Sequence, residues 1–265
     1  MDFNYSTPGN FKKWYSGLII VGILTLILGF IFLHPFSSGH GDDVSSTRFW
    51  AVLLMNAVYW LLLVNVALFF IAISTLAMGS WQVSFRRVNE AISSTIPVLG
   101  AIALIVMLCL VFGNRTDIYH WLDKEAVQSD KLLNAKKGFL NPAVYLVFSF
   151  VVVGLWAFFS RKFNKISRDS DEGGTMDFDT SKKWMGKNMS LSAYYTALFI
   201  LSVGSIAPWL WLMSIDPHWY STMYSWYTFA STFVAGMALI TIFTVYFKNQ
   251  GVLPYTNKEH IHDLG

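Results

Sequence analysis

The sequence predicts an all-α integral membrane protein, and three observations lead to that fold class. Charged residues make up 13% of the 265 residues, about half of the ~25% that is usual in soluble domains. Hydrophobic residues make up 54%, and they gather in six long segments. The basic residues gather in alternate connections between those segments. Together these features exclude an ordinary soluble domain.

The six apolar segments are each long enough to span a bilayer, which takes about 20 mostly apolar residues. We expect the spans at about 15–34, 49–78, 92–113, 141–160, 191–215 and 224–247. Asp, Glu, Lys and Arg are absent from the apolar body of each segment. We therefore treat residues 1–265 as a single transmembrane domain.

The distribution of Lys and Arg predicts the topology, because basic residues favour the cytoplasmic side of a membrane. Both ends of the chain and two of the connections hold 13 of the 19 basic residues: Lys12, Lys13, Arg86, Arg87, Arg161, Lys162, Lys165, Arg168, Lys182, Lys183, Lys187, Lys248 and Lys258. The alternate connections hold the other six: Arg48, Arg115, Lys124, Lys131, Lys136 and Lys137. The N-terminus is therefore expected in the cytoplasm. Because the charges follow topology and form no single patch, nucleic acid is excluded as a partner.

The first two spans differ in length. The first follows the basic and aromatic sequence FKKWY, whereas the second covers about 30 residues. A straight helix of that length exceeds the ~30 Å hydrocarbon core by about half, so the second span must tilt or protrude. It carries Asn56 and Asn65, whose amides need partners in lipid and so predict a contact with another helix. The alternative is a proton or quinone contact.

The later elements have local signals of their own. Pro97 is expected in the early turns of the third span, after Ser and Thr caps. The connection 114–141 predicts a short surface helix with Trp121 at the membrane interface. Residues 158–184 mix both charges around a pair of glycines and predict a loop after the fourth span. Pro208 predicts a kink near the outer end of the fifth span, and the tail from Pro254 is typical of a capped helix start.

The residues that bind metals and haem argue against a cofactor held by this chain. The six histidines lie at or beyond the expected helix ends: His34, His40, His120, His218, His260 and His262. A membrane haem needs facing histidines inside helices, so haem is not expected. Cys109 is the one cysteine, which excludes a cysteine-based zinc or iron–sulfur set. We expect no metal site and no catalytic residue.

The short connection SIDPHWYSTMYSW, residues 214–226, carries the candidate site. Asp216 and Pro217 suit the cap and first turn of a short outer turn, and the following Trp and Tyr residues suit an interfacial aromatic belt. That interpretation leaves His218 unexplained. A histidine beside Asp216 could instead contact a quinol headgroup, because a quinol must release protons and histidine titrates near neutrality. The structural turn and the quinol contact both stay open here.

The sequence WLWLMSIDPHWYSTMYSWYTFASTFVAGMALITI, residues 209–242, resembles the fifth and sixth spans of the NrfD/PsrC-like membrane subunits of bacterial alternative complex III. The resemblance extends across the six spans and is most specific at residues 214–223. It implies a fold of about ten spans with two four-helix bundles, the first made of spans two to five. This chain stops after span six, so we expect it to be part of a longer protein.

The resemblance also implies a function in the bacterial inner membrane. The complex is a quinol:electron-acceptor oxidoreductase that oxidises menaquinol and passes electrons through iron–sulfur and c-type cytochrome subunits, with a terminal oxidase downstream. One large membrane subunit binds quinol, and its partner is mainly a scaffold. We expect this chain to be the scaffold, which anchors the periplasmic subunits and packs against the quinol-binding subunit. The alternatives are a subunit that binds menaquinol near Asp216 and His218, and a small-solute transporter or channel. The transporter is disfavoured because such proteins place ionisable groups inside the membrane.

Overall fold

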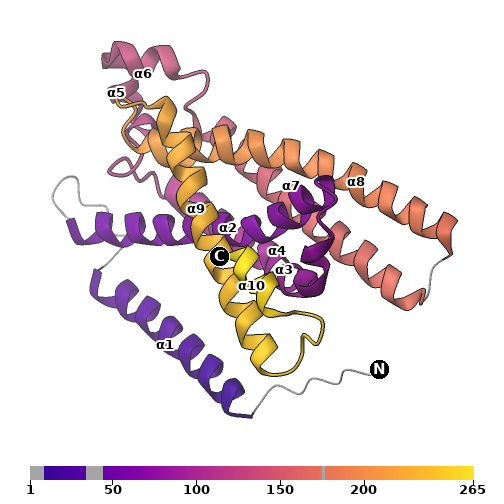
Figure 1. The fold of residues 1–265 in the computed structure, drawn as a ribbon. Helices are drawn as coiled ribbons and strands as arrows, with labels where there is room; N and C mark the ends of the chain where they lie inside the picture. Colours follow the sequence, from indigo (N-terminus) through magenta and orange to yellow (C-terminus); the bar gives the residue numbers. More distant parts are fainter. Residues whose placement is uncertain (1–8, 34–43, 175–176) are drawn as a thin grey trace. The chain divides into compact units, whose positions relative to one another are not determined.

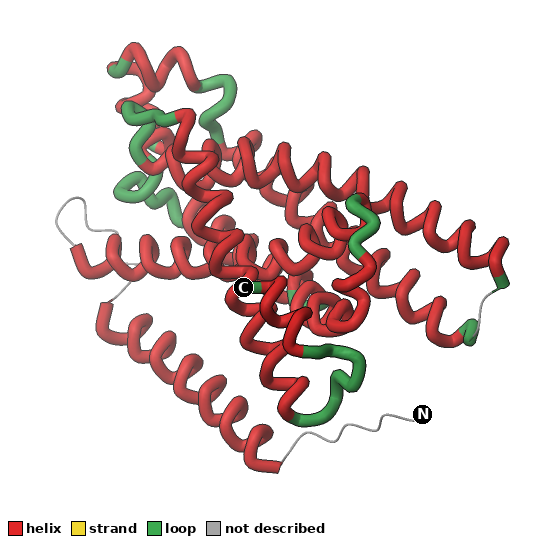
Figure 2. The backbone as a smooth tube through the Cα atoms, in the orientation of Figure 1, coloured by secondary structure: helices red, strands yellow, loops and turns green. Residues whose placement is uncertain are grey.

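The computed structural model describes residues 9–33, 44–174 and 177–265. Within these ranges the chain forms helices and loops without a strand, as the colours in Figure 2 show. The predicted positions of His34 and His40 lie outside the described residues.

Six helices in the described ranges are long and apolar enough to span a membrane. They cover Asn10–Leu33, Val44–Leu76, Ser80–Phe112, Pro142–Glu172, Phe178–Ile215 and Thr222–Asn249. The all-α class and the number of spans predicted from the sequence are thereby confirmed, and the chain has the character of a multi-pass membrane protein.

The chain divides into two compact units, residues 1–55 and 56–265. The first unit contains α1 (Gly9–Leu33) and the beginning of α2 (Val44–Leu76). A Cβ atom added at Gly29 would lie 2.8 Å from the ring of Phe49, and the rings of Phe30 and Phe49 lie edge to face at 5.1 Å. Glycine at position 29 therefore lets Phe49 pack against the backbone of α1.

The second unit is built from the rest of α2 and the helices that follow it in Figure 1. A polar contact inside the second unit joins α2 to α8 (Phe178–Leu201). The Oδ1 of Asn65 in α2 accepts a hydrogen bond of 2.9 Å from the hydroxyl of Tyr195 in α8. This is the interhelical contact predicted for Asn65, whereas Asn56 is exposed. One turn further along each helix, the rings of Phe69 and Phe199 stack at 4.1 Å.

Small residues let the helices of the second unit approach closely. A Cβ at Gly100 of α4 (Ile96–Phe112) would lie 2.5 Å from Val153 of α7 (Pro142–Glu172). A Cβ at Gly236 of α9 (Thr222–Asn249) would lie 2.5 Å from the Cβ of Val66 in α2. Such small residues are typical of helix contacts in membranes, where packing replaces the hydrophobic driving force.

The connection between the second and third spans is helical, and the apolar helix that follows it begins at Ile96, close to the predicted start of span three at residue 92. After a short turn the chain forms η1 (Ser80–Phe85), α3 (Arg86–Ser93) and then α4. The polar sequence RRVNE is accommodated because α3 buries Arg86 and Glu90 as a pair. Pro97 lies in the first turn of α4, as predicted.

The mixed-charge loop predicted at 158–184 is also largely helical. The helix α7 continues to Glu172, and α8 begins at Phe178 with Asp177 as its N-cap. The extension keeps a buried face, because Ser160, Phe163 and Ser167 follow Trp156 at helical spacing. Charged side chains occupy the rest of the surface, which is why the composition alone indicated a loop.

The fifth span changes its winding where Pro208 was predicted to cause a kink. The chain after α8 forms a π-helix, η3 (Ser202–Leu212), followed by the short 3₁₀ turn η4 (Met213–Ile215). Met213 donates its backbone N–H to the carbonyl of Pro208, five residues earlier. π-Helical segments are rare and are frequently found at functional sites.

The connection 113–141 forms three short elements, η2 (His120–Leu122), α5 (Lys124–Ser129) and α6 (Lys131–Lys136). The predicted interfacial position of Trp121 is wrong, since its side chain is buried. Its ring packs on Tyr119 at 5.1 Å and on Tyr145 at 5.4 Å. Trp121 therefore belongs to the aromatic interior of the bundle end.

The tail after α9 forms the capped helix that the sequence predicts, α10 (Lys258–Leu264). Asn257 accepts from the N–H of His260, and the His260 ring accepts from the N–H of Asn257. The preceding Thr256 is buried and donates to the carbonyl of Ser84 at 3.1 Å. Below, residues 113–141 and 213–221 are called the aromatic end, and residues 77–95, 161–174, 177–190 and 250–265 are called the charged end.

Candidate functional site

The turn that carries Asp216 and His218 folds on itself at the aromatic end. The Asp216 carboxylate accepts a hydrogen bond of 3.1 Å from the backbone N–H of His218, and the Asp216 carbonyl accepts one of 3.1 Å from Trp219. Side-chain to backbone bonds of this kind make an aspartate a turn former. Asp216 therefore holds the turn, and α9 begins directly after it with Ser221 at the N-cap position.

His218 pairs with an aspartate that the sequence analysis did not single out. Its Nε2 lies 2.5 Å from Oδ2 of Asp130, while Oδ1 of Asp130 accepts from the N–H groups of Leu132 and Leu133 at the start of α6. The bond from the Leu132 N–H, followed by the one from His218, lowers the pKa of the Asp130 carboxyl. Asp130 thus stays ionised and connects the helix cap to the turn.

A second contact holds the same turn to α6. The Nζ of Lys136 donates to the carbonyl of Pro217 at 2.6 Å. Because Lys136 and Asp130 lie at the two ends of α6, the turn is fixed to this short helix at two points. These contacts order residues 217–218 without using a ligand.

A cavity of about 530 Å³ lies beside the turn, between η3 and the start of α9. It is lined by Lys136, Phe139, Leu140, Gly204, Trp209, Met213, Ser214, Pro217, Trp219, Tyr220, Ser221, Thr222, Ser225 and Trp226. Its volume lies within the range of about 300–1,000 Å³ that is common for small-molecule sites. Asp216 and His218 are not among its lining residues, so the two predicted quinol ligands lie next to this cavity and do not face into it.

A buried aromatic network connects η3, which lines the cavity, to residues of the aromatic end and of α7. The hydroxyl of Tyr119 shares a hydrogen bond of 2.9 Å with that of Tyr145 and donates to the carbonyl of Trp211 at 3.0 Å. The indole of Trp211 donates to Ser149 at 2.8 Å. Burial raises the pKa of the Tyr119 hydroxyl well above its ordinary value, so Tyr119 stays protonated. The network fixes the end of η3 through neutral hydrogen bonds.

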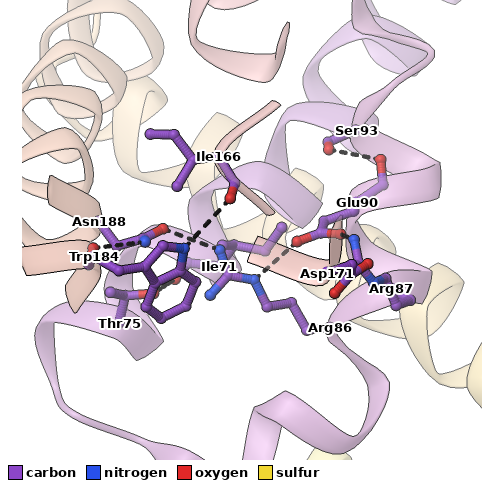
Figure 3. A network of polar contacts seen from close by, with 10 residues as sticks. All are labelled: Ile71, Thr75, Arg86, Arg87, Glu90, Ser93, Ile166, Asp171, Trp184 and Asn188. Carbon is purple, nitrogen blue, oxygen red and sulfur yellow. Dashed lines mark hydrogen bonds and ion pairs between the residues drawn. The ribbon is translucent and has the colours of Figure 1, made fainter. Parts of the chain in front are cut away.

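A second polar cluster lies at the charged end and is drawn in Figure 3. The Nε of Arg86 lies 2.9 Å from Oε1 of Glu90, and its Nη2 donates to Oδ1 of Asn188 in α8 at 3.2 Å. The Arg86 guanidinium also lies 5.7 Å from the ring of Trp184. Arg87 donates to the other oxygen of Glu90 at 2.6 Å and pairs with Asp171 of α7. The cluster therefore joins α3, α7 and α8.

The sequence analysis missed this cluster because it assigned residues 79–91 to a connection. A signal was present in the four-residue spacing of Arg86 and Glu90, which places both on one helix face. Burial could not be read from that spacing, since the partners Asn188 and Asp171 are far away in the sequence. The charged groups of the cluster are paired with one another, so its role is to connect the helices α3, α7 and α8.

Within the described part of the chain, three or more His, Cys, Asp or Glu side chains do not come together as metal ligands. His260 of the tail, for example, accepts a hydrogen bond in the cap of α10.

Comparison with protein-family models and with curated proteins finds no match to this chain. A function has to be argued from the residues and the geometry.

Proposed function

We propose that this protein is an integral membrane subunit of a respiratory quinol:electron-acceptor oxidoreductase of the alternative complex III type. It resides in the bacterial inner membrane with its N-terminus in the cytoplasm. Its role is to anchor periplasmic iron–sulfur and c-type cytochrome subunits and to pack against the quinol-binding subunit. The ten-span NrfD-like fold, of which this chain supplies the first part, belongs to the same proposal.

The observation that carries the scaffold role is the contrast between two sets of aromatic residues at the aromatic end. Tyr119 and Trp121 are buried, whereas Trp219 is 47% exposed and Tyr220 is 79% exposed. The backbone of the turn is held by Asp216, Asp130 and Lys136 without these rings. Rigid, exposed Trp and Tyr side chains are typical of protein interfaces. The turn thus offers a preformed surface for an extramembrane subunit.

The second candidate function, direct menaquinol binding, is favoured by the cavity beside the turn. Much of its wall is aromatic and aliphatic, and its polar lining residues are Lys136, Ser214, Tyr220, Ser221, Thr222 and Ser225. This combination suits a flat headgroup with two oxygens on an isoprenoid chain. In this alternative the headgroup contacts come from the cavity wall, and His218 acts only by holding the turn.

The two roles are separated by filling the cavity. Gly204 lines it, and a Cβ added there would meet no atom within 4 Å, so Gly204→Leu adds bulk without a backbone clash. In a scaffold subunit this variant leaves quinol turnover of the assembled complex within about twofold. In a quinol-binding subunit turnover falls by tenfold or more while all subunits remain. Gly186→Leu is the matched control, because its Cβ is also unobstructed and it lies far along α8 from the cavity.

The class of protein is tested by mild purification of the tagged chain from its native membrane. Haem absorbance and iron–sulfur signals that elute with the chain in fixed ratio support the complex. A stable chain that purifies alone, without haem-containing partners, favours a transporter or channel and contradicts the proposal.

A further inference from the structure

A groove at the charged end contains charged side chains that the fold does not use. It has a volume of about 480 Å³ and lies between the beginning of α4 and the last part of α7. One side of the groove is the junction between α3 and α4. At this junction the hydroxyl of Ser160 in α7 donates a hydrogen bond of 2.7 Å to the carbonyl of Ser93. The groove therefore lies where α7 is bonded to the junction between α3 and α4.

The wall of the groove changes from apolar to charged along α7. Pro97 and Val98 line it at the start of the apolar helix α4. On α7 the lining residues Arg161, Lys165 and Arg168 follow the last apolar turn. Two carboxylates also line the groove: Asp169 directly follows Arg168, and Glu172 lies about one turn beyond it at the end of α7. The order along the groove is thus apolar, then basic, then acidic.

These five charged groups are not paired with one another. Among the described residues none of them takes part in an ion pair within 4.0 Å. The neighbouring Asp171, by contrast, is paired with Arg87 outside the groove. The three basic side chains agree with the cytoplasmic position expected for this end, but within the described residues the fold gives the two carboxylates beside them no ion-pair partner.

The order of apolar, basic and acidic residues along the groove matches the order of the chemical groups in a phospholipid that carries an amine. A phospholipid presents acyl chains, then an anionic phosphate, and then the rest of its headgroup toward water. We propose that this groove binds a phosphatidylethanolamine molecule, with its phosphate at Arg161, Lys165 and Arg168 and its ammonium group at Asp169 and Glu172.

The spacing of the charges fits that headgroup. Lys165 and Asp169 are one helical turn apart, which is about 6 Å along the axis, and a two-carbon linker separates phosphate and ammonium in ethanolamine. Arginine and lysine near a membrane surface attract lipid phosphates, and a primary ammonium donates charge-assisted hydrogen bonds to carboxylates. Phosphatidylglycerol lacks the cation, and the quaternary amine of phosphatidylcholine cannot donate. The carboxylates therefore provide the selectivity.

Lipid titration of the purified, delipidated protein tests this site. Phosphatidylethanolamine, phosphatidylglycerol and phosphatidylcholine with identical acyl chains are added in detergent, and the fraction of lipid-bound protein is read by native mass spectrometry. We expect phosphatidylethanolamine to bind about tenfold more tightly than the other two lipids. Equal binding of all three, or tighter binding of phosphatidylglycerol, would overturn the proposal without any variant.

Variants separate the two halves of the headgroup site. Arg161→Gln with Lys165→Gln removes phosphate contacts and should weaken the binding of every lipid about tenfold. Asp169→Asn with Glu172→Gln should weaken only phosphatidylethanolamine, to the level of phosphatidylglycerol. Lys162→Gln is the control, since Lys162 neighbours Arg161 on α7 and does not line the groove. If Lys162→Gln lowers lipid binding as much as the double variants, the effect is general surface charge and the groove is not the site.

Discussion

Glu90 accepts hydrogen bonds from Arg86 and Arg87, which differ in burial. This difference predicts that mutations in the cluster lower the stability of the protein by different amounts. Arg86 is 8% exposed, whereas the Arg87 side chain is 46% exposed. Glu90→Ala leaves the buried Arg86 without its carboxylate, which costs about 3–5 kcal/mol in comparable sites. We expect a markedly lower Tm of the purified protein in detergent, measured by differential scanning fluorimetry.

The matched control for Glu90 is Arg87→Ala, which removes the exposed partner of the same carboxylate. Arg87 is half exposed and Glu90 keeps its bond to Arg86 in this variant, so its Tm should fall much less than that of Glu90→Ala. Equal losses in the two variants would mean that burial of Arg86 does not determine the stability of this cluster.

The pair of Asp130 and His218 predicts a pH-dependent effect at the aromatic end. The pKa of Asp130 lies below its ordinary value of 3.8 in the folded protein. The ionised carboxylate therefore stabilises the fold above that value, and the stabilisation is lost as the pH falls through the lowered pKa. Asp130→Asn should lower Tm at pH 7, and the difference from the wild type should shrink as the pH falls below 3.8. A difference in Tm that stays the same as the pH falls well below 3.8 would contradict the assignment.

The sequence could predict parts of these residue-scale sites. The turn-forming role of Asp216 follows from its own dipeptide with Pro217, and the structure has it in a turn. The partners of His218 and Arg86 could not be predicted, because Asp130 is 88 residues away and Asn188 is 102 residues away. Such contacts depend on how the helices pack, and a single sequence does not contain that information.

At the scale of elements, Gly236 predicts how closely α9 and α2 must approach. A methyl group there would lie 2.5 Å from Val66 Cβ and 3.1 Å from the carbonyl of Leu63. Overpacking of this kind costs typically about 1–3 kcal/mol, so Gly236→Ala should lower Tm by several degrees. Gly186→Ala is the control, since its Cβ meets nothing within 4 Å and alanine favours a helix by up to about 1 kcal/mol. An unchanged Tm for Gly236→Ala would show that α9 can shift away from α2.

The elements also show where composition misled the sequence analysis. Apolar length was sufficient to find six spans, but the ends of α7 and α3 extend into charged sequence. Helices continue there because one face stays buried while the long charged side chains reach outward. The π-helix η3 has no local signal beyond Pro208, and the hydrogen bonds that join Trp211 near its end to Tyr119 and Ser149 come from residues distant in the sequence.

At the scale of the whole molecule, the distribution of basic residues predicts which end faces which compartment. Ser129 at the aromatic end and Thr180 near the charged end are both exposed. In a background with Cys109→Ala, we expect Ser129→Cys to react with an impermeant maleimide in intact spheroplasts. Thr180→Cys should react only after the membrane is permeabilised. The reverse pattern would place the N-terminus outside and would remove the aromatic end from the periplasm.

The scaffold role predicts that the exposed ring of Trp219 contributes more to subunit assembly than the neighbouring His218 contributes to quinol turnover. Trp219 is available to a partner, and a Trp anchor at an interface often contributes about 2 kcal/mol or more, which is roughly a 30-fold change in affinity. Trp219→Ala should therefore release the iron–sulfur and c-type cytochrome subunits during purification. His218→Ala should leave quinol turnover of the intact complex within a few-fold of the wild type, because His218 contacts Asp130 and not the cavity.

A further variant separates partner docking from simple lipid contact. Phe158 lies within α7 and is 56% exposed, which makes Phe158→Ala a control for loss of a lipid-facing ring. Equal subunit loss in Phe158→Ala and Trp219→Ala would mean that the aromatic turn is only part of the membrane belt. A collapse of quinol turnover in His218→Ala, with every subunit still present, would instead favour direct menaquinol binding at this end of the bundle.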